Sequence, residues 1–333
     1  MNSSNEEPAP SNGTGGHCTE SGPFTVPFLY SFTELSHLIL LVLSLCSAVL
    51  QIHILFRAYI HIKGKSSDKC LHIFLFSATG SDLILTAICY PLELAQKAGL
   101  IPPLPYSLNL TNQLLCWISL IASSFSLVCL NFDKLAYFQF PLRYSQYFTR
   151  RRALWISAAF WFFSVAYTMI SFLKGVFICS KDYCLTVGMD TKDAYIYIVS
   201  VMFTCVLPTI TSLVVAVYIL KIMTAHQKQI KQVFLARMRT FYFVFMTTVF
   251  TALTLLPFRF VSIYRILLGA QNMSCSFSTL LFAFSYLVML NSIVNPLLTC
   301  TILPHYRLTV KICRRHYQMQ PSLRDPDSTR ESI

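Results

Sequence analysis

The 333-residue sequence contains little charge, because Asp, Glu, Lys and Arg together make up only 12% of it. Soluble domains carry roughly a quarter of charged residues. Apolar residues make up 55% of the chain, and they gather in long blocks from which formal charges are nearly absent. A block of about 20 such residues is long enough to cross the hydrocarbon core of a bilayer as a helix. The scarcity of charge therefore disfavours buried helices of a large soluble protein and indicates lipid as the main solvent.

Seven apolar blocks can be distinguished, and we expect each to form a transmembrane helix. They span residues 33–60, 70–97, 106–139, 150–173, 193–223, 232–267 and 275–301. This pattern predicts an all-α membrane protein, a seven-transmembrane-helix bundle over residues 33–303, after a polar tail at 1–32. The last residues, 317–333, are polar and predict a disordered cytoplasmic tail. Neither an internal repeat nor a soluble domain is visible in the sequence.

A cleavable signal peptide is also lacking, since residues 1–24 are polar and rich in Ser, Pro, Gly and Glu. We therefore expect the first helix to direct its own insertion. Most of the twelve cysteines lie in or beside the apolar blocks, where they act as small hydrophobic residues. Only four lie in segments that could face an oxidising compartment: Cys18, Cys179, Cys184 and Cys275. They allow three pairings, which the sequence leaves open.

Acidic residues are few, 14 against 26 basic ones, and the net charge is +12. Such a charge could suggest nucleic-acid binding, but its distribution indicates another cause. Of the 26 Lys and Arg, 20 lie at the ends of alternate blocks, on the same side as the carboxyl terminus. The positive-inside rule then places the amino terminus outside the cell and the carboxyl terminus in the cytoplasm. The N-glycosylation sequons at Asn2 and Asn12 lie in the tail that this topology places outside.

Polar side chains within the blocks are candidate functional groups, because an ionisable residue at membrane depth is costly unless it is paired or hydrated. Asp82 is the clearest example. Asn291 and Asn295 share a face of the seventh block, and Ser123 adds a hydroxyl in the third. Oxygen ligands of this kind suit a hard cation such as sodium, or water. A structural polar cluster without an ion is the equal alternative.

A second polar set lies toward the outer ends of blocks two and six, where Glu93 and Arg259 are found. The guanidinium of Arg259 could bind a ligand carboxylate, or it could pair with Glu93 in the absence of a ligand. Trp117, Phe258, Tyr264 and Tyr286 could supply aromatic walls to a pocket between the helices. We find no metal-ligand cluster and no nucleophile with a base at useful spacing, so an enzyme is not expected. Halves with internal symmetry and broken helices, as in transporters, are not evident either.

Several motifs, in order and at consistent spacing, give the chain a family resemblance. They are Asp82, Asp133-Lys134-Leu135 followed by Pro141-Leu142, Trp161, Pro208, Pro257 and Asn295-Pro296. Together they resemble the rhodopsin-like (class A) family of G-protein-coupled receptors, from the first block through residue 316. The resemblance implies coupling to a heterotrimeric G protein through Asp133, Lys134, Pro141 and Arg237, with Pro257 and Pro296 as switch positions. It also implies a short amphipathic eighth helix at 304–316, with Cys313 as an acylation candidate.

The departures from the family pattern fall at motif positions that the resemblance assigns to the conformational switch. Lys134 replaces the Arg of the third-helix triplet and lacks its planar fork. Leu135 and Thr299 replace tyrosines, Ala48 replaces the first-helix Asn, and Asn109 stands where the family has its third-helix Cys. Cys116 stands where amine receptors carry an Asp, so a peptide or an anionic ligand is favoured over a simple amine. The resulting candidate ligand-binding set is Glu93, Cys116, Trp117, Phe258, Arg259, Tyr264, Ser285 and Tyr286.

We therefore expect an orphan-type plasma-membrane receptor that binds an extracellular ligand and activates a G protein. Loss of several switch residues together motivates a different alternative, a seven-helix scaffold or ligand-scavenging protein that does not couple. No cofactor is expected, and a sodium ion at Asp82 is one of the two alternatives given above.

Overall fold

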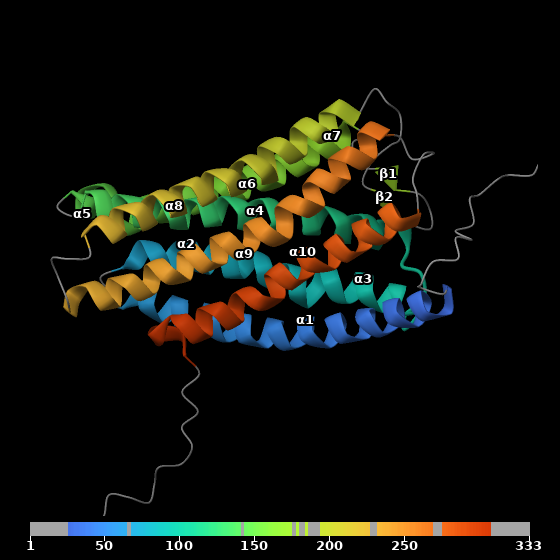
Figure 1. The fold of residues 1–333 in the computed structure, drawn as a ribbon, viewed down its shortest axis with the longest axis horizontal. Helices are drawn as coiled ribbons and strands as arrows, with labels where there is room; N and C mark the ends of the chain where they lie inside the picture. The colour runs from blue at the N-terminus through green and yellow to red at the C-terminus, as the bar shows by residue number, and fades with distance from the viewer. Residues whose placement is uncertain are drawn as a thin grey trace, which may run out of the picture.

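A computed structural model of the chain describes residues 26–64, 68–140, 143–174, 178–179, 184–185, 194–226, 232–268 and 275–307. The described chain is almost entirely helical, as predicted, and folds into one elongated bundle (Figure 1). Its helical segments are α1 (Val26–Lys63), α2 (Lys69–Ile84), η1 (Leu85–Cys89), α3 (Tyr90–Lys97), α4 (Tyr106–Gln139), α5 (Tyr144–Tyr147), α6 (Arg150–Leu173), α7 (Ala194–Val201), η2 (Met202–Val206), α8 (Leu207–His226), α9 (Gln232–Leu268), α10 (Cys275–Ile302) and η4 (Pro304–Tyr306). Two short strands, β1 (Ile178–Cys179) and β2 (Cys184–Leu185), pair antiparallel.

Within the described residues, seven helical stretches are long and apolar enough to cross a membrane. This finding confirms the predicted number of spans, and the predicted blocks agree with the helices to within a few residues at most ends. The largest difference is α1, which begins at Val26 instead of residue 33. We call the end of the bundle that carries β1 and β2 the hairpin end, and the opposite end, which carries α5, the basic end (Figure 1).

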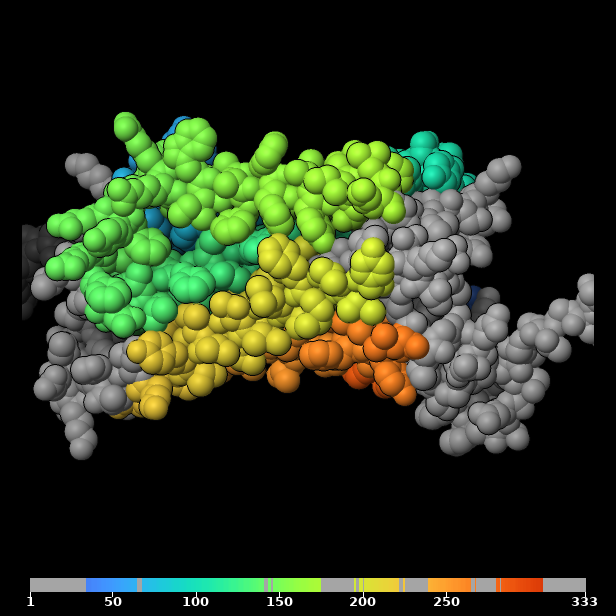
Figure 2. All heavy atoms as spheres, turned by 90° about the horizontal axis from the view of Figure 1, so that it is seen from above, coloured from blue at the N-terminus to red at the C-terminus, as the bar shows by residue number. Residues whose placement is uncertain are grey.

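Helix α4 lies at the centre of the bundle, where it packs against α2, α6, α8 and α9. Helix α6 is at the periphery. Only 17% of its membrane-spanning window is buried inside the protein, compared with 61% for the α2–α3 span. In Figure 2, α6 runs along one edge of the visible face, and α4 can be seen between it and α8. The outward side of α6 is therefore not covered by the other described helices.

Two five-residue π-helical segments interrupt the helices, and each one ends two residues before a proline. Segment η1 precedes Pro91, and η2 precedes Pro208. A proline has no N–H to donate to the carbonyl four residues earlier, and its ring clashes with that carbonyl. The wider π turn spaces the backbone so that the helix continues past the proline. Sequence periodicity did not reveal these two segments.

At the basic end, aromatic and imidazole rings join α1 and α2 to the last turn of the described chain. The Tyr306 hydroxyl lies 2.6 Å from His72 Nδ1, and the His61 ring stacks on that of His72 at 4.9 Å. Tyr306 is fully buried, and burial raises the pKa of its phenol, so the hydroxyl stays protonated. This junction fixes the end of α10 against α1 and α2.

The eighth helix that we predicted at 304–316 is described only at its start. Residues Pro304–Tyr306 form a single 3₁₀ turn, η4. Residues from 308 onward, which include the acylation candidate Cys313, lie outside the described residues.

Candidate functional site

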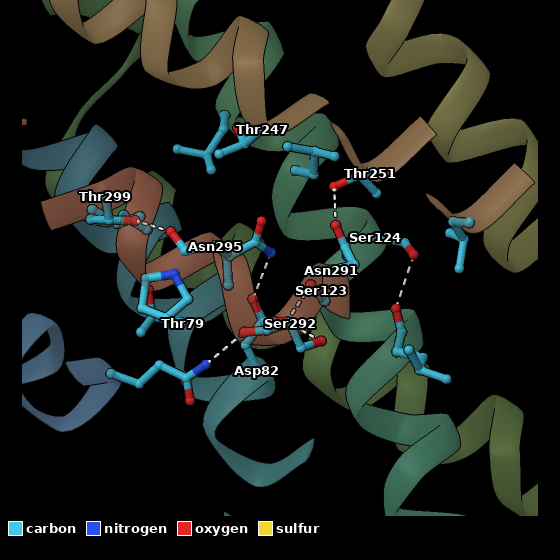
Figure 3. A pocket seen from close by; sticks show the side chains of 18 of the residues that line it. Thr79, Asp82, Ser123, Ser124, Thr247, Thr251, Asn291, Ser292, Asn295 and Thr299 are labelled. Carbon is cyan, nitrogen blue, oxygen red and sulfur yellow. Dashed lines mark hydrogen bonds between the residues drawn. The ribbon is translucent and has the colours of Figure 1, made fainter. Parts of the chain in front are cut away.

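The Asp82 carboxylate is the centre of a buried polar network that joins three helices (Figure 3). Ser123 on α4 donates to Asp82 Oδ1 at 3.2 Å. Ser292 on α10 donates to the same oxygen at 3.3 Å, and Asn295 donates through Nδ2 to Oδ2 at 2.9 Å. Asp82 is almost completely buried, so these three donors replace the water that its carboxylate would otherwise need. The network ties α2, α4 and α10 together.

The carboxylate borders a cavity of about 50 Å³ that extends along α9 and α10. A cavity needs only about 10–15 Å³ to hold one water molecule, so this one has room for water or a small cation. Asn295 Oδ1 is buried there and has no hydrogen-bond partner among the described residues. Together with the carboxylate and the two serine hydroxyls, it completes a set of oxygen atoms of the kind that hard cations bind. The donor set therefore fits a sodium ion.

Two of the sodium candidates predicted from sequence, Ser123 and Asn295, contact Asp82, whereas the third behaves differently. Asn291 lines the same cavity, but its Oδ1 accepts a hydrogen bond from Thr251 on α9 at 3.0 Å (Figure 3). Sequence reasoning missed Ser292. It lies three residues before Asn295 and so on nearly the same helix face, which was the available signal.

Gln51 on α1 supplies an amide three residues after Ala48, the position where the first-helix Asn was expected. Its Nε2 donates to the carbonyl oxygen of Ser292 at 3.0 Å, and its Oε1 accepts from Thr86 at 2.6 Å. The side chain is fully buried. This amide therefore links α1 to η1 and α10, although Ala48 itself carries no polar group.

Nearer the hairpin end, three predicted ligand residues come together around a buried guanidinium. Arg259 is only 2% exposed. Its guanidinium carbon lies 5.0 Å from the centre of the Trp117 ring and 5.5 Å from that of Phe258. Both distances fall within the range of cation–π contacts. Stacking uses the faces of the guanidinium, while its in-plane N–H groups are the ones that bind carboxylates.

Glu93 has a partner on its own helix. Its carboxylate pairs with Lys97 at 2.6 Å, four residues further along α3, and both side chains are about one third exposed. The alternative in which Glu93 pairs with Arg259 thus differs from the geometry found. The i, i+4 spacing of Glu and Lys was the sequence signal for this pair.

The other ligand candidates have the following contacts and exposures. Tyr286 contacts His37 on α1 at 2.8 Å, and Tyr264 is 52% exposed. Cys116 is buried in an apolar cluster with Cys89, and Ser285 lies half-buried on α10. Of the predicted set, Trp117, Phe258 and Arg259 thus form one contact group.

At the basic end, the coupling candidates Asp133 and Lys134 form a buried ion pair. The Lys134 ammonium lies 3.1 Å from Asp133 Oδ2, and it also lies 5.6 Å from the centre of the Tyr137 ring. The hydroxyl of Tyr144 on α5 donates to Asp133 Oδ1 at 2.7 Å. Burial and the nearby Asp133 carboxylate raise the pKa of the Tyr144 phenol, which keeps it a donor.

A second link joins α4 to α9 close to this ion pair. Asn131 Nδ2 donates to the Thr248 hydroxyl at 2.9 Å, and both residues are fully buried. Sequence reasoning did not single out either residue. Of the other predicted positions, Arg237 lies in α9 and Pro257 and Pro296 lie inside continuous helices, whereas Pro141 lies outside the described residues.

The backbone favours one pairing among the predicted disulfide candidates. The register of β1 and β2 places Cys179 opposite Cys184. Residues directly opposite in an antiparallel pair have Cα atoms about 4.5–5.5 Å apart, within the range that disulfides span. Asn2, Asn12 and Cys18 lie outside the described residues.

Comparison with known proteins gives two matches. Residues 58–298, from α1 to α10, match the family described as 7 transmembrane receptor (rhodopsin family). The chain is also 31% identical over 219 residues to G-protein coupled receptor aex-2 of Caenorhabditis elegans. That alignment covers 64% of this chain and spans 63% of the length of the relative.

Proposed function

The chain belongs to the rhodopsin family of seven-transmembrane receptors, and from this premise we propose that it is a plasma-membrane receptor that activates a heterotrimeric G protein when an extracellular ligand binds. The family is one of receptors and not of enzymes, in agreement with the expectation from sequence. In this proposal the hairpin end is extracellular and the basic end faces the cytoplasm, because most of the Lys and Arg among the described residues lie at the basic end.

The observation that carries the proposal is the position of the Asp82 cavity. It lies between the Arg259 contact group at one end and the Asp133–Lys134 pair at the other, and residues of α2, α4, α9 and α10 line it. A receptor needs an element that both ends can bias between two arrangements. A cavity into which polar side chains of several helices project leaves room for their hydrogen bonds to rearrange at lower cost than in a packed core.

The contacts of Arg259 support the proposal that the ligand is a peptide or small molecule with a carboxylate. A guanidinium that already stacks on Trp117 and Phe258 keeps little conformational freedom for ligand binding to remove. A bidentate carboxylate fits its edge. Glu93 is already paired with Lys97. This pair argues against Glu93 as a partner of Arg259.

The oxygen set around Asp82 supports sodium as a second ligand of the same receptor. A cation there would be held by the Asp82 carboxylate, the hydroxyls of Ser123 and Ser292, and Asn295 Oδ1. Such an ion would stabilise the arrangement in which these groups converge, which we take to be the inactive one. Sodium should then oppose the agonist.

The rival function is a seven-helix scaffold or scavenger that binds a ligand without coupling. Its support is the burial of Lys134, which is 2% exposed and held by Asp133 and the Tyr137 ring. A charge held in this way contributes to a partner only after the ion pair opens. Agonist-stimulated nucleotide exchange on G proteins in purified membranes separates the two, because a scaffold binds its ligand and gives no exchange.

A further inference from the structure

Three histidines and one tyrosine meet at the basic end of the bundle, and we call this group the histidine junction. Its members are His61 on α1, His72 on α2, and His305 and Tyr306 on η4. The ring centres of His61 and His72 are 4.9 Å apart, and those of His61 and His305 are 5.1 Å apart. The proposed signalling function assigns no role to these imidazoles.

A shared metal ion does not account for the histidine junction. The His61 and His72 rings are nearly parallel, at 16°, so their in-plane nitrogen lone pairs do not aim at a common point. Among the described residues, no group of three or more His, Cys, Asp or Glu side chains could hold a metal ion. The chemistry that fits three adjacent imidazoles is therefore the binding and release of protons near physiological pH.

The histidine junction runs from solvent into the core. His305 is exposed, His61 is half-buried, and His72 is only 3% exposed. At the inner end, the hydroxyl of the fully buried Tyr306 lies 2.6 Å from His72 Nδ1. Because the phenol stays protonated, its hydroxyl donates to Nδ1 when that nitrogen carries no proton. A proton on Nδ1 therefore removes the acceptor of this hydrogen bond.

Charged side chains reach the histidine junction from the helices that pack against it. They are Arg57 on α1, Asp68 at the start of α2, and Asp133 and Lys134 on α4. Arg57 lies within electrostatic range of His61, and Lys134 lies within electrostatic range of His72. The Asp133 carboxylate is already paired with Lys134.

A proton added to the cluster therefore introduces like charges. A charge on His305 lies 5.1 Å from the His61 ring, and a charge on His61 lies 4.9 Å from the His72 ring. Like charges at such distances repel, the more so where water is excluded. The exposed His305 takes up a proton most readily, and its charge then acts on the inner rings.

We propose that the histidine junction is a proton-sensitive latch, which holds η4 against α1 and α2 at neutral pH and releases it when the side of the membrane at the basic end becomes acidic. Stacked neutral imidazoles and the bond between Tyr306 and His72 close the latch. Repulsion between protonated imidazoles opens it. This side is the cytoplasm in the topology proposed above, but the latch itself does not depend on coupling to a G protein.

Proton linkage sets the direction and size of the effect. An imidazole released into water has its ordinary pKa of about 6.5, so at pH 5.5 about ten of every eleven such side chains carry a proton. Opening therefore becomes about tenfold more favourable at pH 5.5 than at pH 7.5 for each imidazole that is neutral in the closed latch. The latch keeps its full stability well above the ordinary pKa and loses stability as the pH falls below it.

Hydrogen exchange measured by mass spectrometry tests the latch on the whole chain in phosphatidylcholine nanodiscs, without ligand or G protein. The reporter is segment 299–306, where the N–H groups of Leu303 and Tyr306 donate to the carbonyls of Thr299 and Leu303, both at 3.1 Å. Labelling times are scaled to the intrinsic exchange rate at each pH. We expect the protection of this segment to fall at least about tenfold from pH 7.5 to 5.5. Amides in the centre of α4 should keep theirs.

A histidine elsewhere on α1 provides the matched control. His72→Asn offers an amide oxygen to the Tyr306 hydroxyl and takes up no proton in this pH range. In the His61→Asn, His72→Asn double variant, protection of the reporter should change by about twofold at most. His53→Asn should respond like the unaltered chain, because His53 lies on α1 about two turns from His61 and outside the junction.

Unchanged protection of segment 299–306 at pH 5.5 would overturn the proposal, as would an equal loss in the double variant. A loss that extends equally to the centre of α4 would also overturn it, because it would show general unfolding. If the double variant fails to fold, His61→Asn alone decides: it should lose less protection than the unaltered chain, and an equal loss would count against the latch. These outcomes leave the proposed signalling function untouched, since neither ligand nor G protein is present.

Discussion

Replacing Thr248 by Val removes a single hydrogen bond between α4 and α9 with almost no change of shape. The Thr248 hydroxyl accepts from Asn131 Nδ2 at 2.9 Å and donates to the Val244 carbonyl at 2.7 Å. Asn131 retains its other bond, to the Leu127 carbonyl at 3.0 Å. Val keeps the two branches at Cβ, so the loss is confined to the hydroxyl.

The magnitude follows from what hydrogen bonds between membrane helices contribute. Double-mutant cycles give about 0.6 kcal/mol on average and about 1.7 kcal/mol at most. If ligand-driven activation separates α9 from α4 at the basic end, this free energy stabilises the inactive arrangement only. Its loss should shift the balance toward the active arrangement by about threefold for 0.6 kcal/mol, and by roughly 18-fold at the upper limit.

The assay is basal nucleotide exchange on a G protein in membranes that contain equal amounts of each receptor variant. Thr247→Val is the matched control, because the Thr247 hydroxyl donates to carbonyls of its own helix, those of Phe243 and Val244. Basal exchange should rise for Thr248→Val and stay unchanged for Thr247→Val. Combining Thr248→Val with Asn131→Leu should add less than the sum of the single effects.

Basal exchange that is unchanged or lower in Thr248→Val would refute the reasoning. So would an equal rise for Thr247→Val, which would indicate a general loosening of α9 instead of a broken link to α4. Ligand binding measured on the same membranes shows whether each variant is folded.

Three further predictions concern topology, sodium and the ligand. An epitope at residue 10 should be accessible on intact cells and one at residue 325 only after permeabilisation, and the reverse pattern would be incompatible with a receptor. Removing sodium should raise agonist affinity of the unaltered chain, and Asp82→Asn should abolish that response; a variant that keeps it would leave only the structural role of Asp82. Arg259→Gln should weaken binding of an anionic ligand by about 1.5–3 kcal/mol at normal surface expression. Lost expression that Glu93→Gln restores would instead show that Glu93 is the partner of Arg259.

The spans could be predicted from sequence because lipid imposes a length and a composition on each one. All seven coincide with the expected blocks to within three residues at the ends where they extend beyond them. The two π-helical segments could not be predicted. A proline such as Pro91 or Pro208 shows that the regular helical hydrogen bonding is interrupted, but not whether the helix responds with a kink or with a π turn. The two π segments therefore had to come from the structure.

The Asp82 network was predicted in part, and the errors share a physical cause. Spacing shows which residues share a helix face, but it does not fix the rotation of that helix against its neighbours. Asn291 and Asn295 lie on one face, yet the Asn291 side chain accepts a hydrogen bond from Thr251 and does not contact Asp82. Ser292 was not among the predicted residues, and a serine in a helix commonly bonds to its own backbone instead of to another helix. Its bond to Asp82 depends on how α10 meets α2.

Contacts between helices that are distant in sequence could not be predicted either, because the sequence does not fix how the helices are rotated against one another. The Asn131–Thr248 link joins residues 117 positions apart. By contrast, the Glu93–Lys97 pair is local, and the i, i+4 rule could have identified it. The sequence thus predicts which polar groups are unusual, and the packing of the helices decides their partners.

Isolation of a complex between the receptor and a G protein tests the central claim most directly. The purified chain is incubated with an agonist from a peptide and metabolite library, a panel of heterotrimeric G proteins, and a nucleotide-hydrolysing enzyme. A coupled receptor should form a nucleotide-free complex that elutes as one species and dissociates when GTP is added, since GTP and receptor oppose each other on the same G protein. A ligand-bound chain that forms no GTP-sensitive complex with any heterotrimer would contradict the account and identify the protein as a non-coupling scaffold or scavenger.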